Sequence, residues 1–222
     1  MGIYARLALK QSCVLCQAPA DFCLCADCQQ QLSSHTQRCR CCALKLDSAC
    51  DFCAHCLTQA PHFSRTYALY DYSPTCAQLI KQFKFGGELC IGRYFAERLA
   101  QLFERIEQNY DVIIPMPLHP ARLKQRGYHQ GLELLRVIKR YGVPIDSRCV
   151  KRNKPTRALS LLSAHQRHSE IKGAFSAQPV TYQNVLLVDD VMTTGASLNE
   201  LAKTLKQQGG VKRCDVLVVA RA

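Results

Sequence analysis

The 222-residue sequence predicts an α/β protein, in which helices cover both faces of a parallel sheet and a small cysteine-rich region comes first. Three observations lead to this prediction. Beyond residue 60, strand-like and helix-like segments alternate, which is typical of parallel sheets with crossover helices. A continuous apolar segment at 185–188 ends in two aspartates. Eleven of the fifteen cysteines lie between Cys13 and Cys56.

The cysteine-rich region contains four Cys-x2-Cys pairs. In chain order, they are Cys13 and Cys16, Cys25 and Cys28, Cys39 and Cys42, and Cys53 and Cys56. Two such pairs supply the four thiolates of a tetrahedral zinc site. The region has little apolar periodicity, so metal binding would have to stabilise its fold. Since cysteines fill every predicted position, no vertex is left for a catalytic water. We therefore expect two structural zinc ions.

Three further cysteines leave the choice of zinc ligands open. Cys23, Cys41 and Cys50 are left over, and each could replace an assigned ligand. Cys50 and Cys53, for example, also form a Cys-x2-Cys pair. The alternative to zinc is a set of reduced, unligated thiols. We expect His35 and His55 at the surface rather than among the ligands.

The first half of the α/β part follows a linker near residues 60–62. The apolar pattern predicts a strand at 65–72, helices at 75–85 and 88–108, a buried strand at 110–115, a basic loop at 118–126 and a helix at 130–141. Gly86 and Gly87 separate the first two helices. In the second helix Ile91, Phe95 and Leu99 lie on one side, which predicts burial of that side.

The second half of the α/β part has the same alternation. We expect a strand at 148–152, a basic, serine-rich loop to about residue 172, a strand at 184–190, a helix at 197–208 and a strand at 215–220. Ser197 and Glu200 have the spacing of a capping box at the start of the helix. Gly209 and Gly210 end it.

Charge is distributed unevenly along the chain. The 29 basic and 17 acidic residues give a formal net charge of +12, of which residues 119–172 contribute +10. Such a stretch suits a phosphate-rich partner, either a small molecule or a nucleic acid, although a solvated basic face would look the same. No segment approaches the roughly 18 apolar residues of a membrane span. With no signal-peptide pattern at residue 1, we expect a cytoplasmic protein without membrane insertion.

The segment 185–197 has the pattern of a ligand site. Its strand delivers Asp189 and Asp190 to the carboxyl end of the sheet, where ligands bind in open α/β folds. The loop that follows offers backbone N–H groups, hydroxyls and the start of a helix to a phosphate; it consists of Thr193, Thr194, Gly195, Ala196 and Ser197. Carboxylates beside such a loop suit the hydroxyls of a sugar phosphate. An ATPase strand is the alternative, but the chain has no G-x-x-x-x-G-K-[ST] motif to accompany it.

This segment resembles the phosphoribosyl pyrophosphate (PRPP) signature of type I phosphoribosyltransferases. Together with the cysteine pairs and the segments 84–87, 114–118, 126–130 and 173–175, it makes nearly the whole chain similar to the ComF/GntX family. The resemblance implies a double zinc-ribbon region at 1–60 and a type I phosphoribosyltransferase-like domain at 61–222. It also implies a role in competence, that is, the handling of incoming single-stranded DNA during DNA uptake.

The resemblance further assigns roles to residues. Asp189 and Asp190 would contact the ribose hydroxyls, and residues 193–197 the 5′-phosphate. The loop after Pro117 would bind pyrophosphate with His119, Arg122 and Lys124, and Arg126 is a second candidate for that role. Asp189, Asp190 and Arg126 are the candidate catalytic residues. Mg²⁺ would bridge the pyrophosphate and ribose oxygens. The implied partners are PRPP, single-stranded DNA and a DNA-uptake helicase.

Two classes of function remain open at this stage. As an enzyme, the protein would transfer a phosphoribosyl group to an acceptor that no residue identifies. Four histidines are possible general bases, namely His119, His129, His165 and His168. Alternatively, the protein would be a non-catalytic single-stranded nucleic-acid-binding adaptor or a PRPP-sensing module. Binding of DNA through its phosphate backbone would weaken steeply as the salt concentration rises, whereas binding of PRPP with Mg²⁺ would depend less on salt. The salt dependence therefore distinguishes DNA binding from PRPP binding.

Overall fold

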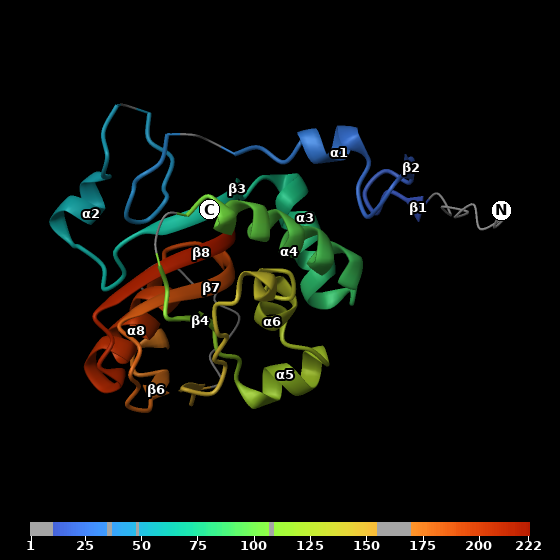
Figure 1. Cartoon of the computed structure of the whole chain (residues 1–222). Coiled ribbons are helices and arrows are strands. Elements are labelled where there is room, and N and C mark those ends of the chain that lie inside the picture. Colours follow the sequence, from blue (N-terminus) through green and yellow to red (C-terminus); the bar gives the residue numbers. More distant parts are fainter. Residues whose placement is uncertain (1–10, 35–36, 48, 107–108, 155–169) are drawn as a thin grey trace.

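The computed structural model describes residues 11–34, 37–47, 49–106, 109–154 and 170–222 (Figure 1). Its strands are β1 (Gln11–Ser12), β2 (Pro19–Ala20), β3 (Thr66–Asp71), β4 (Val112–Pro115), β5 (Val150–Arg152), β6 (Phe175–Ala177), β7 (Asn184–Met192) and β8 (Arg213–Arg221). Its α-helices are α1 (Ala26–Gln30), α2 (Ala54–Thr58), α3 (Pro74–Phe85), α4 (Leu89–Glu104), α5 (Pro120–Arg126), α6 (Gln130–Leu134) and α8 (Ala196–Thr204). A 3-10 turn, η1 (Ile138–Tyr141), and a π-helical turn, η3 (Leu205–Gly209), complete the set.

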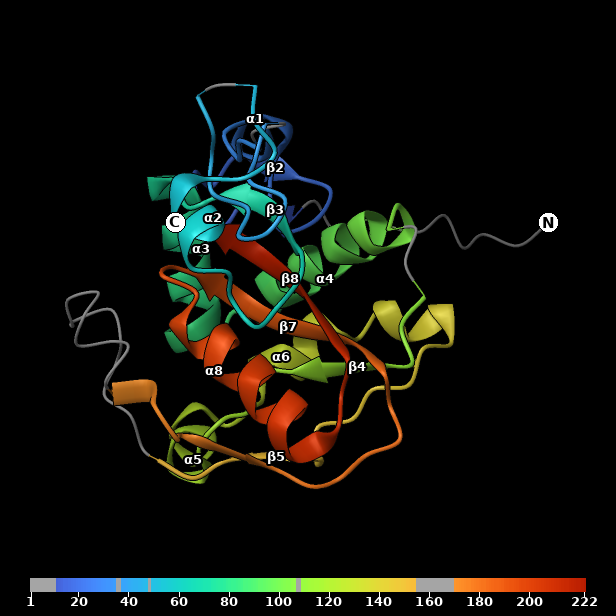
Figure 2. The ribbon, with the colours of Figure 1, turned by 90° about the vertical axis from the view of Figure 1, so that its left-hand side faces the viewer.

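A four-stranded parallel sheet forms the centre of the molecule. Its strand order is β3-β8-β7-β4, and every neighbouring pair is parallel. The two central strands pair along their length, from Asn184 opposite Arg213 to Met192 opposite Arg221. Figure 2 shows α8 on one face of this sheet and α4 on the other. The predicted fold class, a parallel sheet with helices on both faces, is confirmed. β5 and β6 form a separate antiparallel pair.

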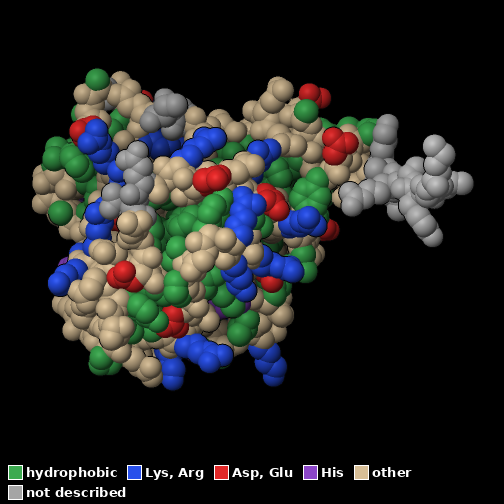
Figure 3. Space-filling model, viewed as in Figure 1, with side chains coloured by type: hydrophobic (Ala, Val, Ile, Leu, Met, Phe, Trp, Pro, Cys, Tyr) green, Lys and Arg blue, Asp and Glu red, His purple; other side chains and the backbone are tan. Residues whose placement is uncertain are grey.

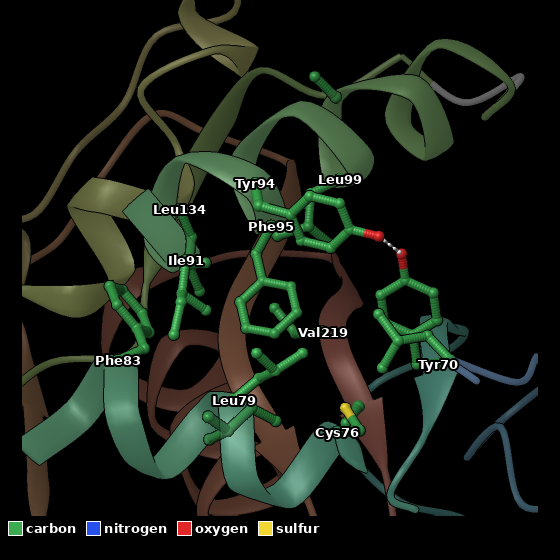
Figure 4. Close-up of a cluster of buried hydrophobic side chains, with 14 of the residues drawn as sticks. Tyr70, Cys76, Leu79, Phe83, Ile91, Tyr94, Phe95, Leu99, Leu134 and Val219 are labelled. Atoms are coloured by element: carbon green, nitrogen blue, oxygen red, sulfur yellow. Dashed lines mark hydrogen bonds between the residues drawn. The ribbon is translucent and has the colours of Figure 1, made fainter. Parts of the chain in front are cut away.

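Alternation along β7 and β8 explains why these strands are continuously apolar. Leu186, Val188, Leu217 and Val219 belong to the core beneath α3, α4 and α6, where Figure 4 shows Leu79, Phe83, Ile91 and Phe95 around Val219. Val185, Leu187, Val216 and Val218 belong to a second core, with Leu198, Leu201 and Leu205 from α8 and η3. A parallel strand with helices on both sides has no solvent face, so every position favours an apolar residue.

Four local predictions differ from the structure. Residues 118–126, expected as a loop, contain α5, which no apolar period announces because none of its residues is buried. The helix expected at 130–141 is α6 followed by η1, since Leu135 ends α6. α8 begins at Ala196 with Gly195 as its N-cap, so the prediction of a capping box that starts at Ser197 was wrong. Glu200 Oε1 instead accepts the Gly173 N–H at 2.7 Å. The strand β6 was not expected.

The cysteine-rich region packs against the sheet at two different places. Cys13, Leu24 and Cys28 join the core beneath α4, whereas Cys39 and Cys53 join the core beneath α8. In Figure 1, α1 and α2 accordingly lie at opposite ends of the upper edge of the molecule. The division into domains near residue 60 stays a prediction. None of the described helices is long and apolar enough to cross a membrane.

Candidate functional site

The structure gathers the eight predicted metal ligands into two groups of four thiols. One group contains Cys13, Cys16, Cys25 and Cys28, and the other Cys39, Cys42, Cys53 and Cys56. Within each group all Sγ atoms lie within 4.8 Å of one another, and no other such group occurs among the described residues. Cys23, Cys41 and Cys50 stand outside both. His35 lies outside the described residues.

The local backbone favours one thiolate in each group, whereas burial raises the pKa of Cys28 and of Cys56. Burial opposes ionisation of Cys13, but the N–H groups of Cys25, Cys16 and Leu15 donate to its sulfur and lower its pKa to about 6. Burial likewise opposes ionisation of Cys39, yet N–H groups of Cys42 and Cys53 bring its pKa to about 7. Four converging thiols with backbone N–H donors fit a tetrahedral zinc ion. A structural metal in each group is therefore supported.

A cavity of about 840 Å³ lies at the carboxyl ends of β4 and β7. It is lined by α3, by α5, by the loop 193–197 and by both aspartates of β7. Each of these elements is brought there by the sheet, since parallel strands end together at one edge. The sequence placed the aspartates and the loop at this edge. The wall made by α3 was not foreseen.

The two aspartates of β7 have different surroundings. The Asp190 carboxylate is only 5% exposed and pairs with Lys84 Nζ of α3 at 2.6 Å. Its other oxygen is buried and has no hydrogen-bond partner among the described residues. Asp189 Oδ1 accepts the Asp190 N–H at 2.9 Å. Burial and the charge of Asp190 raise the pKa of Asp189 to about 7. This carboxyl therefore takes up a proton far more readily than an exposed one.

The loop between β7 and α8 turns on Gly195. Its φ of +77° lies in the left-handed region, and a Cβ there would come within 2.7 Å of Met192 Cε. The positive φ therefore favours glycine, whereas the terminal methyl of Met192 can shift to make room for a Cβ. The hydroxyl of Thr194 accepts the Ala196 N–H at 3.4 Å. The remaining N–H groups at the start of α8 form the type of end that attracts anions.

Three arginines line the same cavity as the aspartates, namely Arg122, Arg126 and Arg152. The guanidinium of Arg126 lies 5.4 Å from the centre of the Phe85 ring, and that of Arg152 lies 5.7 Å from the Phe175 ring. Burial lowers the pKa of both side chains. On the face shown in Figure 3, Lys and Arg side chains also gather over α4 and at the lower edge near α5.

Most of the predicted ligand-binding residues meet in this cavity, but two do not. Asp189, Asp190, Arg122, Arg126 and residues 193–197 all line it. His119 instead caps α5 by accepting the Ala121 N–H, and Lys124 is not part of the lining. His129 caps α6 in the same way. His165 and His168 lie outside the described residues.

Several cavity residues were missed by sequence reasoning, among them Lys84 and Arg152. Lys84 belongs to the segment 84–87, which carried part of the family resemblance, so a signal was available. Arg152 comes from β5, where it is one of many basic residues between 119 and 172. Nothing in its local pattern distinguishes it from exposed neighbours.

Comparisons with known proteins find relatives that match 90% or more of this chain. No family model matches the chain. It is 34% identical to Competence protein F of Haemophilus influenzae, over 90% of each chain. It is 30% identical to the DNA utilization protein YhgH of Escherichia coli, over 91% of this chain and 94% of the relative. With Competence protein ComFC of Streptococcus pneumoniae the identity is 26%, over 94% of this chain and 92% of the relative.

Solved structures give weaker matches. The allosteric regulatory enzyme of purine biosynthesis matches 58% of this chain with a TM-score of 0.38 and 15% identity. UMP synthase of Leishmania donovani matches 64% with a TM-score of 0.34 and 17% identity. This chain covers 26% and 24%, respectively, of those two chains.

Proposed function

Because the chain belongs to the ComF family of competence proteins, we propose that it acts in DNA uptake and binds PRPP with Mg²⁺ in the cavity at the end of the sheet. The name DNA utilization protein, given to relatives of similar length, supports the first part. The second part depends on the chemistry of the cavity.

One observation carries the proposal of PRPP binding: the two carboxylates, the phosphate-type loop and three arginines all line one cavity. In this proposal Asp189 and Asp190 accept hydrogen bonds from the ribose hydroxyls. The N–H groups and hydroxyls of residues 193–197 hold the 5′-phosphate. The guanidinium groups of Arg122, Arg126 and Arg152 face the pyrophosphate, since such groups form paired hydrogen bonds with phosphate oxygens.

The donor groups beside the cavity also suit Mg²⁺. Magnesium prefers oxygen ligands and keeps several of its waters, and Asp190 offers a buried oxygen without a partner among the described residues. When bound with PRPP, the ion would neutralise the pyrophosphate. The protein's own contribution to transfer would come from Arg126, which stabilises charge on the departing pyrophosphate. Asp189 and Asp190 would orient the ribose.

Calorimetry tests the proposal directly. We expect the zinc-loaded protein to bind PRPP in the presence of Mg²⁺, and the Asp189→Asn/Asp190→Asn variant to bind at least about tenfold more weakly. Asp21→Asn is the matched control, because Asp21 is exposed and outside the cavity, and its affinity should not change. A folded, zinc-loaded wild type that fails to bind PRPP would contradict the proposal.

A second candidate function, binding of single-stranded DNA, is favoured by the wall that α3 contributes. Phe85 is 72% exposed and Tyr72 is 43% exposed, and both line the cavity. Lys81 and Lys84 of α3 lie between them in the chain and also line the cavity. Exposed aromatic rings beside cationic side chains are the combination on which bases stack while the backbone is neutralised. We propose that a single strand follows α3 and passes the PRPP site, as an acceptor or as a bound partner.

The α3 wall can be tested by fluorescence anisotropy with a labelled oligonucleotide. Phe85→Ala should weaken binding by about 5- to 100-fold, since stacking of one base contributes about 1–3 kcal/mol. Leu57→Ala is the matched control: Leu57 is 70% exposed but lies on α2, away from the cavity. Affinity should also fall steeply with salt. Equal affinities of Phe85→Ala and wild type would exclude this wall. Docking to a DNA-uptake helicase is a further proposal, for which no surface is assigned.

A further inference from the structure

Arg221, at the end of β8, joins the second cysteine group to the phosphate-type loop. Its Nε donates to the carbonyl oxygen of Cys42 at 2.7 Å. Its Nη1 donates to the carbonyl oxygens of Thr193 at 2.5 Å and of Met192 at 3.3 Å. One side chain therefore contacts the backbone of a predicted metal ligand and the backbone of the loop.

A second connection runs through Phe63, which follows the cysteine-rich region. The carbonyl oxygen of Phe63 accepts the thiol of Cys41 at 3.8 Å. Its ring is 3% exposed and lies 3.7 Å from the place that a Cβ of Gly195 would occupy. Three residues further along the chain, Thr66 donates its N–H to the carbonyl oxygen of Arg40 at 3.3 Å. The second cysteine group is thus attached to the loop on two sides.

The first cysteine group has no comparable path among the described residues. Its neighbours contact α4: the Arg93 guanidinium lies 5.3 Å from the Phe22 ring, and Arg98 donates to Gln29 Oε1 at 2.7 Å. α4 covers the face of the sheet opposite α8. The two groups are chemically alike, but only one adjoins the loop.

The contact with Thr193 has a direct effect on the geometry of the loop. A trans peptide is planar, and its C=O and N–H point in opposite directions. Since Arg221 holds the Thr193 carbonyl, the Thr194 N–H is directed away from Arg221. The bond to Met192 orients the Thr193 N–H in the same way. The side chain that binds Cys42 therefore sets the direction of two N–H groups in the loop.

We infer that a metal ion in the second cysteine group, held by Cys39, Cys42, Cys53 and Cys56, positions the phosphate-binding loop through Arg221, whereas a metal ion in the first group does not. Arg221 is a positioning residue for the ligand site. The inference rests on the proposed function, since it requires that the loop binds phosphate. Metal binding is coupled to folding of the residues around it, so loss of the ion frees the Cys42 backbone from its place beside Arg221.

Such coupling must act in both directions. If the metal raises the affinity for PRPP by some factor, PRPP raises the affinity for the metal by the same factor. Ligand binding should therefore raise the affinity of the second group for zinc and leave the zinc affinity of the first group unchanged. A residue that merely stabilises the fold would not produce this difference.

The experiment uses full-length, zinc-loaded protein and three variants. Cys28→Ser disrupts the first group, Cys56→Ser the second, and Arg221→Gln leaves all eight thiols in place. We measure zinc content, PRPP affinity with Mg²⁺ by calorimetry, and zinc affinity by equilibrium competition with a chromogenic chelator, with and without PRPP. Cys28→Ser should bind PRPP within about threefold of wild type. Cys56→Ser and Arg221→Gln should bind about tenfold more weakly, within the usual range of coupling. Arg221→Gln should still contain two zinc ions.

Zinc affinity supplies the second readout. PRPP should raise the zinc affinity of Cys28→Ser, where only the second group is intact, and not that of Cys56→Ser or Arg221→Gln. Should Cys56→Ser fail to fold, Arg221→Gln decides. Unchanged PRPP affinity in Arg221→Gln, or a zinc affinity that PRPP raises equally in all variants, would overturn the inference while the proposed function stands. A wild type that binds neither PRPP nor inorganic phosphate would remove the proposed function and this inference with it.

Discussion

Replacing Asp189 by Asn should stabilise the protein at pH 8 and weaken its binding of PRPP. Burial and the neighbouring Asp190 raise the pKa of Asp189 to about 7, from an ordinary value of 3.8. Between these two values the folded state holds the proton more tightly than the unfolded state does. Wild type therefore loses stability as the pH rises from about 4 to about 7, and the loss is complete above 7. Asn carries no charge and avoids this loss.

The size of the effect follows from the shift. About three pKa units correspond to about 4 kcal/mol for the fully ionised group. Asp189 is partly exposed, so solvent screening reduces the penalty to the order of 2 kcal/mol. Asn retains an oxygen that can accept the Asp190 N–H, now 2.9 Å from Asp189 Oδ1. For a chain of this length, 2 kcal/mol corresponds to about 4–8 °C in Tm.

Thermal unfolding of zinc-loaded protein at pH 5.5 and at pH 8 measures the effect. Asp189→Asn should have the higher Tm at pH 8, and the difference from wild type should be smaller at pH 5.5 by about 2–4 °C. Asp190→Asn gives the contrasting sign, because it removes the charged partner of Lys84 and should lower the Tm. An Asp189→Asn variant less stable than wild type at pH 8, or a difference independent of pH, would refute the reasoning.

Three further substitutions probe the loop and the two ends of the sheet. Gly195→Ala forces a residue with a Cβ into the left-handed region and brings that Cβ to within 2.7 Å of Met192 Cε, so it should lower the free energy of unfolding by about 1–3 kcal/mol and weaken PRPP binding. Urea unfolding and calorimetry measure these two effects. An unchanged midpoint of urea unfolding would contradict the prediction. Gly92→Ala would place a Cβ 2.5 Å from the Phe83 ring between α3 and α4, with an expected loss of about 1–3 kcal/mol in urea unfolding and no loss of zinc. Tyr110→Phe removes the hydroxyl that donates to Oδ2 of the buried Asp215 at 2.9 Å, and should lower the free energy of unfolding by about 1–3 kcal/mol. An unchanged free energy of unfolding would mean that Arg213 alone satisfies that carboxylate.

The cysteine groups show what short-range spacing can determine. Each Cys-x2-Cys pair lies within one local turn, so its spacing places two sulfurs on the same side whatever the rest of the chain does. The eight thiols that gather in the two groups were therefore predicted correctly. The strand and loop at 185–197 were predictable for the same reason, because Asp189 and the loop that contains Gly195 are consecutive in the chain.

Apolar runs determined the sheet and most of its helices. A strand buried on both faces favours apolar residues at every position, and both β7 and β8 have such a continuous apolar segment. The same signal failed for α5, since a helix without buried residues has no apolar period. A different signal, the capping-box spacing of Ser197 and Glu200, failed at the start of α8, where Gly195 occupies the N-cap position.

The sequence by itself thus determined the fold class, the two groups of thiols and the loop with its aspartates, because each is encoded by residues close together in the chain. Only the tertiary structure decided which distant side chains reach them. It brought Lys84 to Asp190 and Arg152 to the same cavity, and it left His119 and Lys124 outside. It also placed Arg221 between Cys42 and Thr193. Patterns of burial tell which residues turn inward, but the packing of helices on the sheet selects which of them meet.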